Sequence, residues 1–323
     1  MPILVIGLGS MGKRRIRDLL ALQEREVTGW DPRDDRRKEA EQRFGIRTFS
    51  SLVAAMQESI YAIVISTPPD THMQYAHIAA DRKIPFFTEA SVTSDGIASL
   101  IEKLSATPEL IAAPSCTMMF HPAVSIIHDL VKRKAVGEKM FFHYHSGQYL
   151  PDWHPYEDYR TYYVSKKETG GCREIVPFEW MWITSIFGPI RGLSAAIGKV
   201  SQLDAEIDDV YQMIVSLSDG TRGQITIDVV SRIPTRRFVL IGEEGTITWD
   251  FFSRDVILYT GSGKRTTTIA VLHEGRPFHY EDMYCSEMKA FLAAIEGRPF
   301  PHDYVRDLSL LKTLEQMERE AIL

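Results

Sequence analysis

The residues near the start of the chain whose types and spacing could do chemistry are three glycines in a short run. The run reads Gly7-Leu8-Gly9-Ser10-Met11-Gly12. In a G-x-G-x-x-G pattern the first glycine makes a tight turn, the second lets a pyrophosphate approach the backbone, and the third lets a helix pack on a strand. N–H groups at the start of that helix bind phosphate oxygens. The spacing therefore predicts a turn that binds the pyrophosphate of a dinucleotide.

An acidic residue follows where a bound dinucleotide would place its adenosine ribose. Asp31 lies about twenty residues after the glycines, a distance at which a carboxylate can accept hydrogen bonds from the ribose hydroxyls. A negative charge there repels a ribose 2′-phosphate, which favours NAD over NADP. Arg33, Arg36 and Arg37 follow and could partly compensate, so NADP stays possible; the alternative is that they form a solvated helix face.

Further candidate cofactor contacts follow two later apolar runs, at residues 62–65 and 85–88. Ligands of a doubly wound sheet bind beyond the carboxyl ends of its strands, where such turns gather. The candidates are Ser66, Thr67, Pro68, His72 and Glu89.

The elements that must position these groups alternate in type through residues 1–118. Strands are expected at 3–6, 26–30, 62–65, 85–88 and 110–113. After the glycines, Ile16, Leu19 and Leu20 recur at helical spacing, and Arg15 with its basic neighbours falls on the other side. The alternation predicts an α/β domain over residues 1–118 with a doubly wound parallel sheet.

Residues 119–323 show long strands of alternating polarity instead. Within 223–230, Ile225, Ile227 and Val229 share one face and polar residues share the other. We expect a second, α+β domain over 119–323, with an open-faced, mainly antiparallel sheet that is free to meet helices, substrate or another subunit.

Composition excludes several classes of function. The formal charge is −6, with 37 Lys and Arg against 43 Asp and Glu, so nucleic acid is not an expected partner. The first apolar run is too short for a signal peptide or a membrane span. Cys116, Cys172 and Cys285 form no CxxC pair, which fits a cytoplasmic protein. His143 and His145 lack a third ligand, so we expect no metal site.

Taken together, the chain resembles the glucose-fructose oxidoreductase / inositol dehydrogenase (Gfo/Idh/MocA) family along nearly its whole length. The supporting motifs are Gly7–Gly12, Ser66–His72, Phe120–Ala123, Gly242–Thr246 and Tyr280–Ile295. The most specific part is Tyr149–Pro155 with Asp158-Tyr159-Arg160 and Gly170-Gly171, which is similar to the branch of nucleotide-sugar and nonulosonic-acid gene products. The resemblance implies a Rossmann domain, a substrate-binding domain, hydride transfer between NAD(P) and a sugar or nucleotide-sugar hydroxyl, and a homodimer or homotetramer formed through the open sheet.

Two residues that the family uses for proton transfer are replaced. Members of the family usually have Glu-Lys-Pro where this chain has Glu89, Ala90 and Ser91. The family also places a histidine, followed by an acid, on the helix after the Gly-Gly pair; without gaps these positions are Phe178 and Met181. Because alcohol oxidation needs a base for the hydroxyl proton, the sequence predicts an atypical active site.

Three side chains are candidates for the relocated acid/base group: Glu174, Glu179 and His154. Glu174 shares a face with Phe178 if the helix includes both, but a helix that begins near Pro177 would leave Glu174 in the preceding turn. A closed site could raise the pKa of either carboxyl group. Alternatively, Glu174 pairs with an arginine, and Glu179 faces solvent or caps its helix.

Substrate contacts are expected from an aromatic stretch. Trp153 and Tyr159 would shape the pocket, and Arg160 would bind a phosphate or carboxylate. The stretch also contains Tyr156, Tyr162 and Tyr163, and its alternative is a packed domain seam. Three functions remain: an NAD-dependent sugar dehydrogenase, which we favour; a non-redox enzyme on the same ligands; and a non-catalytic sensor or partner.

Overall fold

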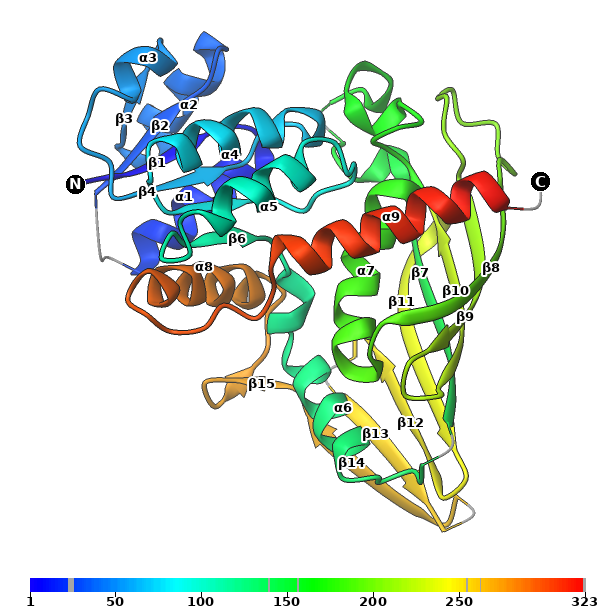
Figure 1. The fold of residues 1–323 in the computed structure, drawn as a ribbon. Helices are drawn as coiled ribbons and strands as arrows, with labels where there is room; N and C mark the ends of the chain where they lie inside the picture. Colours follow the sequence, from blue (N-terminus) through cyan, green and yellow to red (C-terminus); the bar gives the residue numbers. More distant parts are fainter. Residues whose placement is uncertain (23–25, 139, 156, 254, 262, 322–323) are drawn as a thin grey trace. The chain divides into compact units, whose positions relative to one another are not determined.

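The chain divides into two units, one of which is built from two separate segments. A computed structural model describes residues 1–22, 26–138, 140–155, 157–253, 255–261 and 263–321. Unit 1 comprises residues 1–117 and 283–311, and unit 2 comprises residues 118–282 and 312–323. Figure 1 shows the ribbon coloured along the sequence.

Unit 1 contains a six-stranded parallel sheet of order β3-β2-β1-β4-β5-β6. Its strands are β1 (Ile3–Ile6), β2 (Val27–Trp30), β3 (Arg47–Phe49), β4 (Ala62–Ile65), β5 (Phe86–Thr88) and β6 (Ala112–Pro114). The central strand β1 is buried along its whole length, as its aliphatic run requires. This arrangement confirms the predicted doubly wound parallel sheet.

Helices connect these strands and continue the chain at its C-terminal end. They are α1 (Ser10–Leu22), α2 (Asp34–Phe44), α3 (Leu52–Ala55), α4 (His72–Asp81), α5 (Ile97–Ser105), α8 (Glu281–Ile295) and α9 (Tyr304–Glu320). Gly45 ends α2 with a left-handed conformation (φ +67°), which a glycine adopts without steric cost. Among the described residues, none of the helices is both long and apolar enough to span a membrane.

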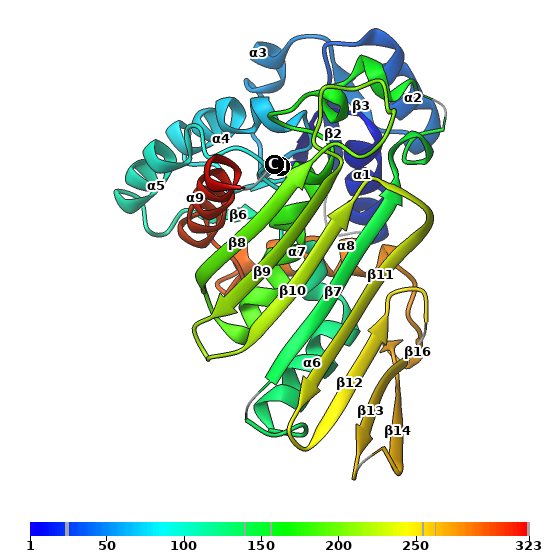
Figure 2. The ribbon, with the colours of Figure 1, turned by 90° about the vertical axis from the view of Figure 1, so that its right-hand side faces the viewer.

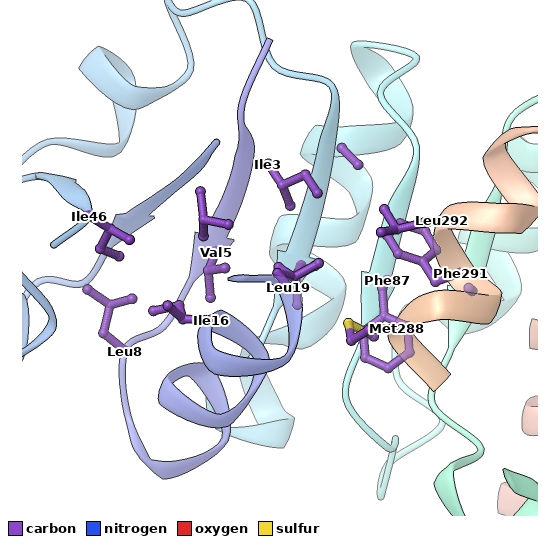
Figure 3. Close-up of a cluster of buried hydrophobic side chains, with 14 of the residues drawn as sticks. Ile3, Val5, Leu8, Ile16, Leu19, Ile46, Phe87, Met288, Phe291 and Leu292 are labelled. Carbon is purple, nitrogen blue, oxygen red and sulfur yellow. The ribbon is translucent and has the colours of Figure 1, made fainter. Parts of the chain in front are cut away.

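The hydrophobic core of unit 1 explains why residues 283–311 fold with residues 1–117. Ile3 and Val5 of β1 pack with Ile16 and Leu19 of α1, and with the first segment's other apolar side chains. Figure 3 shows α8 completing this cluster. The α8 side chains in it are Met288, Phe291 and Leu292. The sequence-based division placed all of residues 119–323 in a second domain, whereas residues 283–311 belong to the same compact unit as residues 1–117.

Unit 2 contains an eight-stranded sheet of order β14-β13-β12-β11-β7-β10-β9-β8. Its strands are β7 (Met140–Tyr149), β8 (Ile190–Gly198), β9 (Val210–Leu217), β10 (Arg222–Asp228), β11 (Val230–Gly242), β12 (Gly245–Asp250), β13 (Asp255–Thr260) and β14 (Arg265–Ala270). Only the β7–β10 pair among these strands is parallel. A short hairpin, β15 (Leu272–His273) with β16 (Arg276–Pro277), lies outside this sheet.

Helices cover one face of this sheet. Figure 2 shows α6 (Pro122–Lys132) and α7 (Cys172–Phe187) behind the strands, with no α-helix from the described residues of unit 2 in front of β7, β10 and β11. The two faces of the sheet differ because side chains alternate between them along each strand, and successive residues of β9 are buried and exposed in turn. The expected open-faced, mainly antiparallel sheet is confirmed.

Replacing Phe291 with alanine should destabilise unit 1, because the ring is fully buried and packs 5.8 Å from the ring of Phe87. We expect the free energy of unfolding in urea to fall by about 3–5 kcal/mol. Val305→Ala, at a 62% exposed site on α9, is the control and should change it by less than about 0.5 kcal/mol. Similar losses in both variants would contradict the packing of residues 283–311 in this core.

Candidate functional site

The glycine turn has the geometry that a pyrophosphate needs. Gly7 has φ +92°, and a Cβ atom there would lie 2.5 Å from the carbonyl oxygen of Ser66. A Cβ atom on Gly12 would lie 1.9 Å from the carbonyl oxygen of Gly7. The nearest atom to a Cβ on Gly9 is Nη1 of Arg36, at 3.5 Å. Packing therefore demands glycine at the two ends of the motif, while the middle glycine leaves its surface open, as close approach of a phosphate requires.

The residues between the glycines have distinct roles. The side chain of Leu8 lies in the core, and its backbone N–H donates a 2.8 Å hydrogen bond to Oδ2 of Asp31. Ser10 is exposed at the first residue of α1, and Met11 is half-buried. The helix begins at the turn, so its first N–H groups lie where an anion would bind.

Asp31 is tied to the backbone on both sides. Its Oδ2 accepts from the N–H of Leu8 and its Oδ1 accepts from the N–H of Arg33, at 2.9 Å. The whole residue is only 2% exposed. The carboxylate therefore fixes the turn relative to β2, in addition to any contact with a ribose.

The predicted residues at the ends of β4 and β5 come together in part. Ser66 donates to Oε1 of Glu89 at 3.0 Å. His72 lies buried at the start of α4 with Nε2 2.8 Å from the carbonyl oxygen of Thr67, and burial lowers the pKa of His72. Because a carbonyl oxygen only accepts, Nε2 carries the proton and the neutral ring is favoured. Pro68 is exposed on the same turn.

Sequence reasoning missed the buried partner of Glu89. Arg15 lies on the basic side of α1, yet it is 0% exposed. Its guanidinium donates to both carboxylate oxygens of Glu89, at 2.7 and 2.9 Å, and to Glu287 of α8 at 2.8 Å. Burial alone would raise the pKa of Glu89, but the charge of Arg15 outweighs it and lowers that pKa. The available signal was Glu287, an acid four residues before the buried Phe291 on α8 and therefore on the same face of the helix.

Glu287 closes this network. It accepts hydrogen bonds from the hydroxyls of Ser115 and Thr117 and from the N–H of Cys116, at 2.6–3.0 Å. The segment after β6 is thereby fixed to α8.

In unit 2, helix α7 begins at Cys172 and continues through Pro177. Glu174 therefore lies in its first turn, one turn before Phe178, which is the helical arrangement of the two that the sequence allowed. Oε1 of Glu174 accepts a 2.9 Å hydrogen bond from the hydroxyl of Tyr163. Its Oε2 is buried without a hydrogen-bond partner among the described residues.

Burial controls the titration of this carboxyl group. It raises the pKa of Glu174 to about 7, although the hydrogen bond from Tyr163 opposes the shift. The alternative of pairing with Arg173 does not apply, because that guanidinium contacts Glu318 at 2.9 Å and the carbonyl oxygen of Glu168. Glu174 can therefore exchange a proton near neutral pH.

Glu179 differs sharply from Glu174. It is fully buried, so the alternative of a solvent-facing residue is wrong. Its two oxygens accept from Tyr144 at 2.6 Å, Trp182 at 2.9 Å, Ser146 at 3.2 Å and Arg236 at 2.7 Å. Four donors, one of them the cation Arg236, hold this carboxylate, which favours a structural role.

The aromatic stretch is only partly a pocket. The ring of His154 stacks on Tyr162, with centroids 5.6 Å apart, and Tyr162 contacts Tyr163 edge to face. The indole Nε1 of Trp153 is buried without a partner in the described part of the chain. His154 and Trp153 are both half-buried, and their roles in proton transfer and substrate binding stay predictions. Tyr156 lies outside the described residues.

Two other expected substrate contacts are engaged with the protein itself. The hydroxyl of Tyr159 accepts from the N–H of Asp204 at 3.2 Å. Arg160 is about half exposed and pairs with Asp158 at 2.6 Å and Asp204 at 3.5 Å. An anionic substrate would compete with these carboxylates for Arg160.

The two histidines of β7 do not converge on a common point. His143 contacts Gln224 at 3.0 Å and His145 contacts Asp228 at 2.7 Å. Within the ranges that the structure describes, no three His, Cys, Asp or Glu side chains are arranged to hold a metal ion.

Comparison with known proteins decides the family. The profile of the oxidoreductase family with an NAD-binding Rossmann fold (Gfo/Idh/MocA) matches residues 1–106, and the profile of the Gfo/Idh/MocA C-terminal domain matches residues 124–248. The chain belongs to the Gfo/Idh/MocA family of oxidoreductases. The two matches follow each other along the chain in the order of the two units. No curated protein sequence gives a significant match.

Solved structures share the fold over the full length of this family member. Levoglucosan dehydrogenase in complex with NADH has a TM-score of 0.85 at 17% identity and covers 99% of this chain and 98% of its own. UDP-N-acetylglucosamine 3-dehydrogenase from Acidithiobacillus ferrooxidans has a TM-score of 0.78 at 19% identity, over 99% and 97%. An oxidoreductase from Agrobacterium radiobacter in complex with NAD+, L-tartaric acid and magnesium has 0.84 at 14%, over 99% and 96%.

The raised pKa of Glu174 predicts a pH-dependent stability. The pKa of Glu174 in the folded protein lies above the ordinary carboxyl value, so binding of its proton contributes to the free energy of unfolding. This contribution is fully present in acid and is lost as pH rises through about 7. Glu174→Gln, which cannot ionise, should therefore gain stability relative to the natural chain between pH 5 and 8. Urea unfolding at several pH values measures the difference in free energy of unfolding between the variant and the natural chain. Glu168→Gln, at an exposed site, is the control. A difference that stays constant with pH for Glu174→Gln would contradict the raised pKa of Glu174.

Proposed function

We propose that this chain transfers hydride between a nicotinamide dinucleotide and a hydroxyl of a sugar or nucleotide-sugar. The observation that carries the proposal is the glycine turn, whose two outer glycines are required by packing while the middle one is left open. Family membership and the activities after which levoglucosan dehydrogenase and UDP-N-acetylglucosamine 3-dehydrogenase are named support the substrate class.

The residues of unit 1 fit the cofactor. The turn from Gly7 to Gly12, including Leu8, Ser10 and Met11, would hold the pyrophosphate, and Asp31 would face the adenosine ribose. Thr67, Pro68 and His72 would line the carboxyl end of β4, with Ser66 and Glu89 held in place by Arg15. When bound, the dinucleotide supplies the hydride acceptor or donor.

Glu174 is the acid/base group that the structure supports best. In the oxidation direction Glu174 would accept the hydroxyl proton of the sugar on a carboxylate oxygen, while the dinucleotide, when bound, would supply the acceptor for the hydride. Its Oε2 lacks a hydrogen-bond partner in the described chain, and its pKa of about 7 suits both loss and gain of a proton. Glu179 lacks this freedom, because four donors saturate it.

The aromatic loop would contribute substrate contacts. Trp153, Tyr159 and Arg160 would bind the sugar and an attached anionic group, and His154 is a second candidate for proton transfer. The partnerless indole N–H of Trp153 supports this, since it can donate to a sugar oxygen. A nucleotide-sugar fits Arg160 through its phosphates.

We further propose a cytoplasmic homodimer or homotetramer formed through the open sheet of unit 2. Phe141 and Ile214 are 45% and 65% exposed on strands β7 and β9 of that sheet. Burying such side chains stabilises an interface. A monomeric mass in solution would contradict this assembly.

Binding and turnover can be tested together. The purified protein is titrated with NADH while nicotinamide fluorescence is followed, and NAD+ reduction at 340 nm is then measured with free sugars and nucleotide-sugars. We expect saturable binding of NADH, and an increase in absorbance at 340 nm with at least one free sugar or nucleotide-sugar. Binding with no turnover across the panel would favour a sensor or partner, and no binding would contradict the proposal altogether.

Glu174→Gln tests the acid/base assignment. The amide cannot take a proton, so kcat should fall by about 10²- to 10⁴-fold while the Kd for NADH is unchanged. In the natural chain, the oxidation rate should rise with pH through about 7, as Glu174 becomes ionised, and this dependence should vanish in the variant. Glu168→Gln is the matched control. Full turnover by Glu174→Gln would move the assignment to His154.

A further inference from the structure

Strand β11 carries a bulge beside the end of β7. The ladder between these strands pairs Val230 with Tyr149, but its next pair joins Thr235 to Gly147. Residues 231–234 are therefore inserted opposite a single residue of β7, as in a β-bulge. Tyr149 is the last residue of β7, and the aromatic loop follows it directly. The bulge thus lies next to the start of the loop that the proposed function assigns to the substrate.

The carboxylate of Asp228 fixes the backbone of this bulge. Its Oδ1 accepts hydrogen bonds from the N–H groups of Val230 and Ser231, at 3.0 and 2.7 Å. Its Oδ2 accepts from the hydroxyl of Ser231 at 3.0 Å and from Nε2 of His145 at 2.7 Å. Asp228 itself is only 4% exposed. Four donors on one buried carboxylate hold the residue before Arg232 in a defined position.

The guanidinium of Arg232 lies over the ring of Tyr149, with Cζ 3.6 Å from the ring centroid. The N–H donors of arginine lie in the plane of the guanidinium, so a contact made through its face leaves them available. Within the residues that the structure describes, exposed Arg232 has neither a hydrogen-bond partner nor an ion-pair partner. The bulge therefore presents a positioned cation whose donors are not used by the protein.

Arg160, the arginine that the sequence assigned to an anionic group, is in a different state. It already pairs with Asp158 at 2.6 Å and with Asp204 at 3.5 Å. A phosphate must displace these carboxylates to bind Arg160, whereas Arg232 has no carboxylate to release. Stacking on Tyr149 also orders the Arg232 side chain in advance, which reduces the entropy lost on binding. Arg232 is therefore the more favourable anion-binding residue beside the aromatic loop.

We infer that Arg232, stacked on Tyr149, binds a phosphate group of the substrate, which is accordingly a sugar phosphate or a nucleotide-sugar. The inference rests on the proposed function and narrows its substrate class. A guanidinium donates two parallel N–H···O hydrogen bonds to a phosphate, and the ring of Tyr149 sets the plane in which Arg232 offers them. Arg160 contributes only after its own carboxylates have been displaced.

The test measures the Kd of UDP by isothermal titration calorimetry in the full-length chain saturated with NADH, so that the dinucleotide site is occupied. Uridine, which lacks the phosphates, is titrated in parallel. Arg232→Ala should weaken UDP binding by about ten- to a hundredfold, as loss of charge-assisted hydrogen bonds predicts, and leave uridine binding within about twofold. Arg237→Ala is the control, because it removes the same charge from an exposed site on the same strand. Tyr149→Phe, which keeps the ring, should bind UDP as the natural chain does, whereas Tyr149→Ala should bind it more weakly.

Other outcomes would overturn the assignment. They are a natural chain that does not bind UDP, UDP binding that survives Arg232→Ala but is lost in Arg160→Ala, and inorganic phosphate that binds as tightly as UDP, which would indicate a site for free phosphate. If NADH does not bind, the proposed function is contradicted, and the UDP titration without NADH still decides the role of Arg232. The two failures are therefore distinct. A circular dichroism spectrum equal to that of the natural chain confirms that each variant is folded.

Discussion

A buried guanidinium between two carboxylates constrains the whole of unit 1. Arg15 comes from α1, Glu89 from the end of β5 and Glu287 from α8. Removing Arg15 would leave two carboxylates buried without their counterion, a defect that costs about 3–5 kcal/mol. The three elements must therefore be assembled together. The glycine turn at the start of α1 and the strand end at Glu89 are positioned by the same contact.

Unit 2 also buries a carboxylate, Glu179, and its surroundings differ from those of Glu174. Both acids lie on α7, but Glu179 has four donors including Arg236, whereas Glu174 has the hydroxyl of Tyr163. Enough donors stabilise a buried carboxylate as an anion; too few favour its neutral form. One helix thus carries an acid held by four donors and, five residues earlier, an acid whose pKa burial raises to about 7.

The sequence predicted local features well and distant ones poorly. The glycine turn and most strands of unit 1 depend on neighbouring residues, so runs such as Ile3–Ile6 were enough to find them. Strand β3 (Arg47–Phe49) was not predicted, because it is three residues long and only Phe49 is buried. The helical position of Glu174 was only one of two options, because a proline inside a helix is unusual and Pro177 suggested a later start. Arg15 was placed on the polar side of its helix, since its partners lie 74 and 272 residues away in sequence. Saturation of Glu179 likewise depends on strands β7 and β11, which no local pattern reveals.

The division of unit 1 into two segments has a consequence for how the protein is made. A ribosome releases residues 1–117 long before residues 283–311, because all of 118–282 must be translated in between. At about 5–20 residues per second this interval lasts roughly ten to thirty seconds. During it, Phe87 lacks Phe291 and Arg15 lacks its second carboxylate, Glu287, so the apolar surface that α8 covers in the folded protein stays exposed on the nascent chain. Cotranslational folding of unit 1 must therefore stop at an incomplete state that a chaperone could recognise, and it can finish only when α8 leaves the exit tunnel.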